Sequence, residues 1–308
     1  MAKVFIDGSA GTTGLRIRER LSARKDIELL ILPEETRKDI SARREMLNNS
    51  DVSFLCLPDA AAIEAVSMIE NDNVTVIDTS TAHRTDPGWI YGFPELSSSI
   101  KNALPSAKRI AVPGCHAGGF IALVRPLVES GLLAASAKLS CHSLTGYSGG
   151  GKKMIADYED ADRSTLLDAP RAYALSCEHK HLKEMKALTG ITTTPIFCPI
   201  VSDFYSGMLV TVPIFADQLC GSVKDVRELY AERYNTPLVK YVEGNDEAGL
   251  LSAGALSGSD RMEVSVFGND ERILLTARYD NLGKGASGAA VECLNYKLGV
   301  DETTGLVI

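Results

Sequence analysis

The sequence predicts an α/β protein with an N-terminal doubly wound parallel sheet and a second, α+β domain. The first observation is a strand, a glycine-rich turn and a helix within residues 3–26. The second is the alternation of strand-like and helical segments up to residue 114, which is typical of a parallel sheet. The third is a change after residue 115 to longer strand-like segments separated by Gly and Pro. With 308 residues, 45% of them hydrophobic, the chain is long enough for two domains.

The elements of the first part follow from the spacing of the apolar residues. Short apolar runs bounded by turn residues predict buried strands, and apolar residues at helical spacing predict helices packed on the sheet. The first strand, helix and second strand form a βαβ unit. The expected elements are strands at 3–7, 28–32, 52–57 and 74–78, and helices at 15–26 and 60–72.

The second part reads as a mixed, largely antiparallel sheet with a few helices. In one of these helices, Ser222 is placed to cap the N-terminus. A glycine-rich loop feeds the last helix. The expected elements are strands at 137–148, 191–201 and 207–216, and helices at 121–133, 222–234 and within 281–299.

Composition excludes several classes of function. The net charge of -8 and the pI near 5.3 argue against nucleic acid or an anionic membrane surface, since both need basic patches. No secretion signal is visible, and no apolar run approaches the roughly 20 residues that span a bilayer. The seven cysteines include no CxxC pair, which favours a reducing compartment. We therefore expect a soluble, cytoplasmic protein that acts on a small molecule.

The loop from Gly8 to Gly14 lies where a dinucleotide-binding loop is expected. Its spacing is GxxGxxG, directly after the first strand and at the start of the first helix. Backbone N–H groups at a helix N-terminus bind a pyrophosphate, and glycines allow the backbone to approach it closely. We predict that a nicotinamide cofactor contacts Gly8, Ser9, Ala10, Gly11, Thr12, Thr13 and Gly14.

The residues after the second strand leave the choice between NAD and NADP open. An acidic residue here binds the ribose hydroxyl of NAD, whereas a basic residue accepts the extra phosphate of NADP. Glu34 and Glu35 are followed, after Thr36, by Arg37 and Lys38, so the signs are mixed. The same four residues also fit a solvated loop.

Cys115 is the candidate nucleophile. It follows Pro113 and Gly114, which predict a turn, and it precedes an apolar helical segment. The dipole and N–H groups at a helix N-terminus stabilise a thiolate and lower the pKa of the thiol. The cysteines that lie within apolar patterns are expected to be buried core residues: Cys56, Cys141, Cys198, Cys220 and Cys293.

The acid/base is expected in the segment CEHKHLKEM. A thiol nucleophile that later delivers a proton to a carbonyl oxygen needs an acid/base, usually histidine. His179 and His181 lie at the expected start of a helix, and Glu184, three residues after His181, would share its face and orient the imidazole. A His-x-His pair also occurs in metal sites, but no third ligand at suitable spacing is apparent, so we predict no metal.

Six motifs occur in a fixed order along the chain. They are GSAGTTGLRI (8–17), DTSTAHRTDPGWIYGFPEL (78–96), VPGCHAGGF (112–120), LTGYSGGGKKMI (144–155), CEHKHLKEM (177–185) and NLGKGASGAAVE (281–292). Together they resemble the family of N-acetyl-gamma-glutamyl-phosphate reductases of arginine biosynthesis, in its shorter variety. The resemblance runs nearly from end to end, and several ordered motifs are more specific than any single one.

The resemblance implies NADPH-dependent reduction of N-acetyl-glutamyl 5-phosphate to N-acetyl-glutamate semialdehyde and phosphate. Cys115 corresponds to the nucleophile, which expels phosphate and leaves a thioester. Hydride transfer then gives a thiohemiacetal, and its collapse releases the aldehyde. His181 or His179 corresponds to the acid/base, and we favour His181.

The resemblance also implies a Rossmann domain of residues 1–114 plus 285–308, completed by the C-terminal helix. Residues 115–284 would form a catalytic domain of the glyceraldehyde-phosphate-dehydrogenase type, in a homo-oligomer that is commonly a tetramer. An acidic substrate requires cations, and residues 148–151 would suit an oxyanion pocket or a flexible loop. Further cofactor contacts are expected at Arg37, Ser80 and Gly285, and substrate contacts at Arg84, Ser148, Gly149, Lys152, Glu184 and Lys284.

Two other interpretations stay open at this point. Aspartate-semialdehyde dehydrogenases share this architecture and chemistry, but their nucleophile usually follows Asn, whereas Pro113 and Gly114 precede Cys115 here. A non-catalytic nucleotide sensor would keep the Rossmann domain, but it has no need of an activated cysteine with histidines in a separate domain. The residues alone do not distinguish aspartyl, glutamyl and N-acetylated acyl groups.

Overall fold

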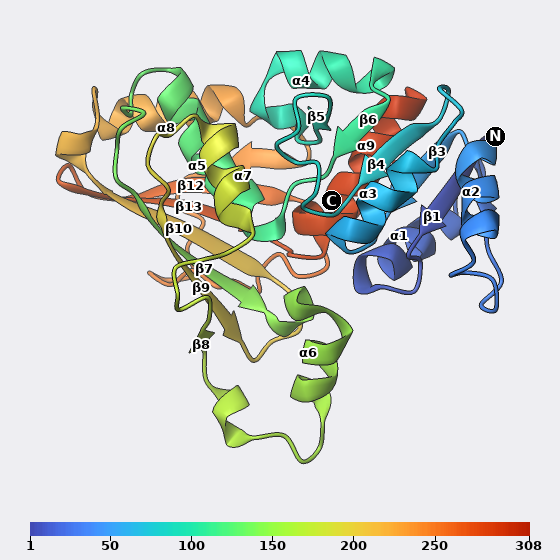
Figure 1. Cartoon of the computed structure of the whole chain (residues 1–308). Helices are drawn as coiled ribbons and strands as arrows, with labels where there is room; N and C mark the ends of the chain where they lie inside the picture. Colours follow the sequence, from blue (N-terminus) through green and yellow to red (C-terminus); the bar gives the residue numbers. More distant parts are fainter. The chain divides into compact units, whose positions relative to one another are not determined.

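The computed structural model describes residues 1–308 and divides into two compact units (Figure 1). Unit 1 comprises residues 1–94, 98–113 and 286–306, and unit 2 comprises residues 95–97, 114–285 and 307–308. Each unit is built on its own β-sheet, as the sequence predicts for an α/β protein with two domains.

Unit 1 contains a six-stranded sheet in the order β2-β1-β3-β4-β6-β5, in which every pair of neighbours is parallel. The short apolar runs of the sequence form its strands. The strands are β1 (Ala2–Asp7), β2 (Ile27–Leu30), β3 (Val52–Leu55), β4 (Thr75–Asp78), β5 (Ile90–Tyr91) and β6 (Arg109–Ala111). The helices are α1 (Thr12–Ser22), α2 (Ile40–Asn49), α3 (Asp59–Ser67), α4 (Ser98–Ala103) and α9 (Gly288–Leu298).

Helices cover both faces of this sheet, because its strands carry apolar side chains on both sides. On one face, α1 and α9 pack in a single apolar cluster with strand residues such as Val4, Phe54 and Ile77. On the other face, α2 and α3 pack against residues such as Phe5 and Val76. The parallel order and the two helical layers confirm the predicted doubly wound sheet, and α9 from the C-terminal end of the chain completes it.

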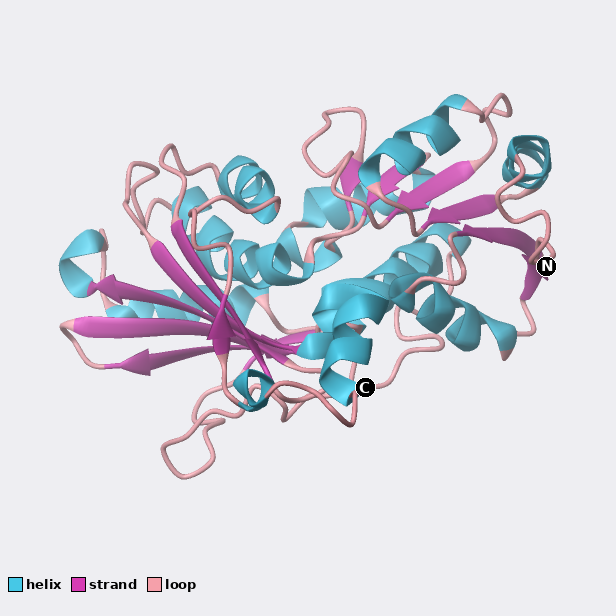
Figure 2. Cartoon of the chain, turned by 60° about the horizontal axis from the view of Figure 1, so that its bottom comes forward, coloured by secondary structure: helices cyan, strands magenta, loops and turns pink.

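Unit 2 contains a seven-stranded mixed sheet in the order β11-β12-β13-β10-β7-β9-β8. Strands are drawn in magenta in Figure 2. Its β11/β12 and β7/β9 pairs are parallel and the other four are antiparallel. The strands are β7 (Ser140–Gly146), β8 (Arg171–Ala172), β9 (Ile196–Ser202), β10 (Met208–Phe215), β11 (Val239–Tyr241), β12 (Met262–Gly268) and β13 (Arg272–Tyr279). The helices are α5 (Cys115–Glu129), α6 (Gly151–Glu159), α7 (His181–Thr189) and α8 (Val223–Arg233).

Helix α5 is the central helix of unit 2. Eleven of its fifteen residues are buried, because it packs against β10 and β13 on the sheet and also against α7 and α8. Helix α8 begins as predicted, with the Ser222 side chain accepting a hydrogen bond from the Asp225 N–H. A helix enclosed in this way is a rigid support for a residue at its end.

The structure corrects one expectation about the cysteines. Cys141 and Cys293 are buried and Cys56 and Cys198 are partly exposed, but Cys220 is exposed. It lies in the loop that precedes the Ser222 cap, beyond the end of the apolar strand pattern. The structure contains no disulfide bond.

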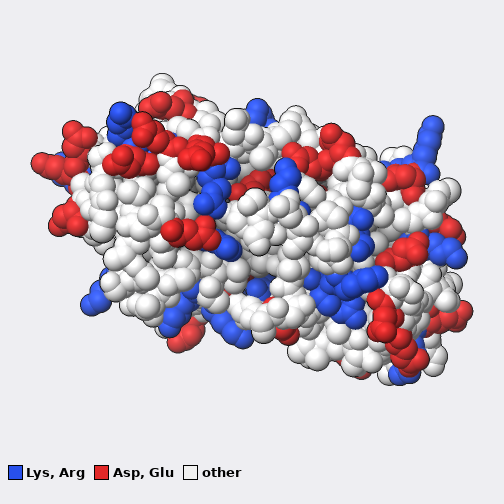
Figure 3. Space-filling view, turned by 90° about the horizontal axis from the view of Figure 1, so that it is seen from above, with Lys and Arg blue, Asp and Glu red and all other residues white.

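None of the helices combines the length and the apolarity needed to cross a bilayer. On the face drawn in Figure 3, acidic and basic side chains are interspersed. The excess of acidic residues gives the chain its net charge of -8.

Candidate active site

The glycine loop of unit 1 is a tight turn that only glycine fits at two positions. Gly8 has a φ of +88°, and a Cβ there would lie 2.3 Å from the Cys56 carbonyl oxygen. A Cβ at Gly14 would lie 2.4 Å from the Gly8 carbonyl oxygen. Helix α1 starts after Gly11 without a side-chain cap. The loop therefore presents a helix N-terminus whose N–H groups receive no side-chain cap, which fits the phosphates of a dinucleotide.

The carboxyl ends of the parallel strands carry buried polar groups. Asp7, which ends β1, forms a buried ion pair with Arg43 at 2.9 Å. Burial raises the pKa of the Asp7 carboxyl, and the Arg43 guanidinium opposes the rise. Asp78, which ends β4, accepts hydrogen bonds from the Ser80 N–H and hydroxyl at 2.9 and 2.6 Å, and contacts the His83 ring nitrogen at 2.6 Å. Such ends of parallel strands are where ligands bind in open α/β sheets.

Two basic residues predicted to contact ligands lie in unit 1. The buried Arg84 guanidinium donates to the carbonyl oxygens of Val112 and Thr79 at 2.9 and 2.8 Å. The exposed Arg37 forms an ion pair at 2.7 Å with Glu34, three residues before it in the same turn. Their roles in substrate and cofactor binding stay predictions.

In unit 2, Cys115 occupies the first position of α5, as predicted. No side chain caps the helix N-terminus at Gly114. The Gly114 N–H instead donates to the Glu184 carboxylate at 2.8 Å, which ties the turn before Cys115 to helix α7. A Cβ at Gly285 would lie 3.2 Å from the Cys115 Cβ, so the glycine leaves room beside the Cys115 side chain.

The Tyr279 hydroxyl lies against the first turn of α5. It donates to the Cys115 carbonyl oxygen and accepts from the Gly119 N–H at 3.1 Å. The side chain is fully buried. Burial and the nearby charge of Cys115 raise the pKa of the phenol well above its usual range, so the hydroxyl keeps its proton.

His116 is the centre of a buried chain of three polar side chains. Its Nδ1 contacts the Ser143 hydroxyl and its Nε2 contacts the Tyr173 hydroxyl, each at 2.7 Å. Burial, with smaller effects of His179 and Lys180, lowers the pKa of the imidazole to about 3. His116 is therefore neutral near pH 7 and has a hydrogen-bond partner at each nitrogen.

The predicted acid/base pair packs against His116. The ring centroids of His179 and His181 lie 5.9 and 5.7 Å from that of His116, and 4.7 Å from each other. His181 begins α7, and its backbone N–H donates to His179 Nδ1 at 3.1 Å. Burial, and then the adjacent Lys180, lower the pKa of His179. The three histidines thus form one cluster, in which His116 belongs to the first turn of α5 and directly follows Cys115.

Glu184 lies on the buried face of α7 together with His181, as the spacing predicts. Its carboxylate receives the Gly114 N–H, a contact that spans 70 residues of sequence. The predicted motif around the two histidines is therefore coupled directly to the backbone that precedes Cys115.

The glycine-rich motif at residues 148–151 is joined to the motif that starts at Asn281. The Asn281 amide donates to the buried Ser148 hydroxyl at 3.0 Å, and its oxygen accepts from the Gly207 N–H. Gly149 is exposed, and so is Lys152 on α6. Substrate binding by these residues stays a prediction.

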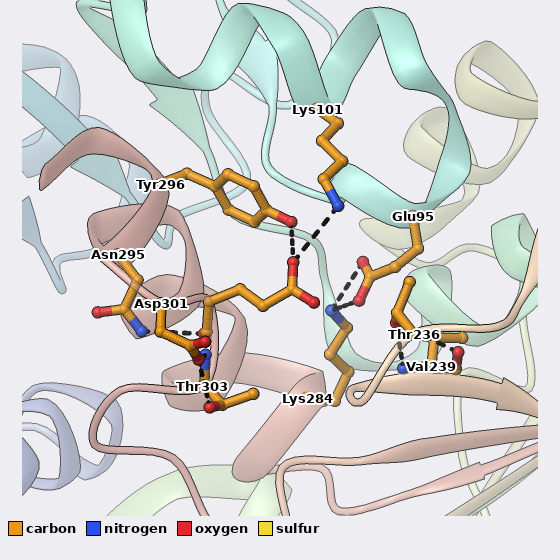
Figure 4. Close-up of polar contacts among 10 residues, drawn as sticks. Glu95, Lys101, Thr236, Val239, Lys284, Asn295, Tyr296, Asp301 and Thr303 are labelled. Atoms are coloured by element: carbon orange, nitrogen blue, oxygen red, sulfur yellow. Dashed lines mark hydrogen bonds and ion pairs between the residues drawn. The ribbon is translucent and has the colours of Figure 1, made fainter. Parts of the chain in front are cut away.

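Lys284 forms a buried ion pair with Glu95. Its ammonium lies 2.7 and 2.9 Å from the two carboxylate oxygens (Figure 4). The side chains are only 2% and 3% exposed. The sequence predicts Lys284 as a cation for the substrate, but its partner Glu95 was not foreseen, because nothing in the local pattern around Glu95 indicates a buried carboxylate.

Several polar residues near Cys115 were missed by sequence reasoning. Tyr279 ends an apolar strand and Tyr173 lies in a loop, and neither shows a local pattern that indicates contact with this site. His116 directly follows Cys115, and adjacent side chains on a helix point apart. The Pro-Gly-Cys-His motif alone could have drawn attention to it.

The comparisons place the chain in a class. The profile of the family described as semialdehyde dehydrogenase, dimerisation domain, matches residues 115–281, and that described as semialdehyde dehydrogenase, NAD binding domain, matches residues 33–103. The fold is similar to that of aspartate semialdehyde dehydrogenase II from Vibrio cholerae, with a TM-score of 0.71, 14% identity and coverage of 97% of this chain and 98% of that one. Fold and sequence thus define a semialdehyde dehydrogenase with a nicotinamide-binding domain.

Relatives with higher sequence identity show which family within this class the chain belongs to. N-acetyl-gamma-glutamyl-phosphate reductase 2 from Nostoc sp. is 43% identical, and the alignment covers 99% of both chains. The N-acetyl-gamma-glutamyl-phosphate reductase from Chelativorans sp. is 45% identical over 96% of this chain and 98% of the relative. The chain belongs to the N-acetyl-gamma-glutamyl-phosphate reductase family.

Proposed function

We propose that this protein reduces N-acetyl-glutamyl 5-phosphate to N-acetyl-glutamate 5-semialdehyde and phosphate, as a step of arginine biosynthesis. The observation that carries the proposal is Cys115 at the uncapped N-terminus of α5, next to the cluster of His116, His179 and His181. The names of the relatives supply the acyl group. Unit 1 would hold the dinucleotide, and unit 2 would carry the covalent chemistry.

In this mechanism, Cys115 attacks the acyl carbon as a thiolate and expels phosphate, leaving a thioester. The N–H groups at the start of α5 and the helix dipole stabilise negative charge on the sulfur and on each tetrahedral oxyanion. His181, or its neighbour His179, donates a proton to the departing phosphate or to the oxyanion that forms when the thioester is reduced. Arg84 and Lys152 would supply positive charge for the acidic substrate.

The cofactor is proposed to be NADP, and when bound in reduced form it supplies the hydride that reduces the thioester. Gly8, Gly11 and Gly14 would hold its phosphates at the start of α1. Arg37 would meet the additional phosphate, because its exposed ion pair with Glu34 contributes little and can exchange. A structure of aspartate semialdehyde dehydrogenase from Candida albicans, with a TM-score of 0.64, is described with NADP.

A phosphate-dependent oxidation assay tests the proposed function. The purified protein is expected to oxidise N-acetyl-glutamate semialdehyde with NADP and phosphate, faster than aspartate semialdehyde and faster with NADP than with NAD. The rise of reduced cofactor at 340 nm measures the rate. A preference for aspartate semialdehyde would contradict the proposed N-acetyl-glutamyl substrate. Equal rates with NAD and NADP would contradict the proposed cofactor.

Replacing His181 with Asn is expected to lower turnover by about a hundredfold or more, because the acid/base is lost. His179→Asn should have a smaller effect. The measurement is kcat as a function of pH, with the exposed His142→Asn as a matched control. If His179→Asn gives the larger loss of turnover, His179 and not His181 is the acid/base.

The protein is proposed to assemble as a cytoplasmic homo-oligomer, commonly a tetramer in relatives of this kind. The matching profile is described as a dimerisation domain. The sheet of unit 2 exposes apolar side chains that an interface would cover, such as Ile196, Phe215 and Leu274.

A further inference from the structure

Three buried tyrosines donate hydrogen bonds to backbone carbonyl oxygens of α5. Tyr230 donates to Leu123, Tyr234 donates to Ala122 at 2.6 Å, and Tyr279 donates to Cys115. Their side chains are 0–1% exposed. The first two contacts lie in the middle of the helix, where the chemistry of a reaction at its N-terminus does not reach. Only Tyr279 contacts the residue that carries the nucleophile.

Tyr279 differs from the other two in the number of backbone groups that it joins. Its hydroxyl donates to the Cys115 carbonyl and also accepts from the Gly119 N–H at 3.1 Å. These two groups lie four residues apart, so the phenol bridges the first helical turn from outside. The first turn of a helix frays readily, because its N–H groups have no intrahelical acceptors. A bridge at this place fixes the backbone from which the Cys115 side chain projects.

Two glycines lie close against the phenol ring. A Cβ at Gly119 would lie 2.6 Å from the Tyr279 hydroxyl, and a Cβ at Gly285 would lie 3.4 Å from the Tyr279 ring and 3.2 Å from the Cys115 Cβ. Two glycines therefore make the slot that admits the ring beside the nucleophile. The Glu184 carboxylate also accepts a hydrogen bond from the Gly114 N–H at 2.8 Å. Cys115 is thus held by its carbonyl on one side and by the preceding peptide on the other.

We infer that Tyr279 is a positioning residue for Cys115: its hydroxyl holds the first turn of α5 so that the sulfur and the N–H groups beside it keep their alignment. The inference rests on the proposed function, because it assumes that Cys115 is the nucleophile. Tyr279 does not exchange a proton in the reaction. It acts through the backbone, and its loss misplaces the sulfur without removing any reacting group.

The test compares Tyr279→Phe with Tyr234→Phe. The second variant also removes a buried hydroxyl that bonds to α5, but at Ala122, away from Cys115. For Tyr279→Phe we expect kcat to fall about tenfold to a hundredfold while KM changes less than about threefold, as for a misplaced reacting group. The pH midpoint for alkylation of Cys115 by iodoacetamide, followed by peptide mass spectrometry, should rise because the aligned N–H groups no longer favour the thiolate. Tyr234→Phe should change neither quantity, even where both variants lose similar thermal stability.

Unchanged kcat and an unchanged alkylation midpoint in Tyr279→Phe would overturn the inference, as would equal changes in both variants. The alkylation profile requires no substrate, so it decides the role of Tyr279 even if the wild-type protein fails to turn over the proposed substrate. If Tyr279→Phe does not fold, Gly119→Ala displaces the hydroxyl while keeping the tyrosine, and the same rise of the midpoint is expected. An unchanged midpoint in Gly119→Ala would then overturn it.

Discussion

Replacing Cys115 with Ser is expected to lower turnover by at least about a thousandfold while leaving cofactor binding unchanged. A serine hydroxyl is far less acidic than a thiol, so it does not ionise near neutral pH even at a helix N-terminus. The measurements are the phosphate-dependent rate with N-acetyl-glutamate semialdehyde and the affinity for NADPH by fluorescence titration. Both use the full-length protein.

The matched control is Cys220→Ser, since Cys220 is exposed in a loop and no role is assigned to it. Its rate should equal that of the wild type. During turnover of the wild type, mass spectrometry should find the acyl group on Cys115. Retention of a tenth of the wild-type rate in Cys115→Ser would exclude the covalent route.

Replacing Lys284 with Met is expected to lower the free energy of unfolding by about 3–5 kcal/mol, because it leaves the Glu95 carboxylate buried without a counter-charge. The side chains of the pair are only 2% and 3% exposed. Water cannot solvate the remaining charge at such a place unless the structure opens. The measurement is chemical denaturation of the variant, of Glu95→Gln and of the double variant Glu95→Gln/Lys284→Met.

An exposed ion pair is the control for this cycle. Lys224 and Glu228 on α8 are 81% and 64% exposed and lie 3.5 Å apart, so Lys224→Met should cost less than about 0.5 kcal/mol. The double variant at Glu95 and Lys284 should recover much of the loss, since two neutral side chains leave no buried charge. Equal destabilisation by Lys224→Met and Lys284→Met would show that burial of the pair has no energetic consequence.

The sequence predicts the local features of this molecule well, because they depend on neighbouring residues. The glycine loop after β1, the start of α5 at Cys115 and the Ser222 cap each follow from a short pattern whose physical cause is local. The doubly wound sheet follows from the alternation of strands and helices. These features position the nucleophile and the loop proposed for the cofactor.

The contacts around Cys115 could not be predicted, because they join distant segments. Tyr279 lies 164 residues from Cys115 in sequence, and Lys284 lies 189 residues from Glu95. Tyr279 reaches α5 because its strand, β13, pairs with β10 and both strands pack against the helix. The pairing of two strands cannot be read from the sequence of either strand alone. The expectation for Cys220 was wrong for a related reason, since the apolar strand ends before it.

The helix α9 has a consequence for the order in which the chain folds during synthesis. Ala289, Val291 and Leu294 fill the same apolar cluster as the first strands of unit 1, yet they leave the ribosome after nearly all of unit 2. Until α9 is made, this apolar face of the first sheet is covered only in part, by α1, while nearly all of unit 2 has already been made. We therefore expect the N-terminal half of the nascent chain to be more prone to aggregation than the finished protein.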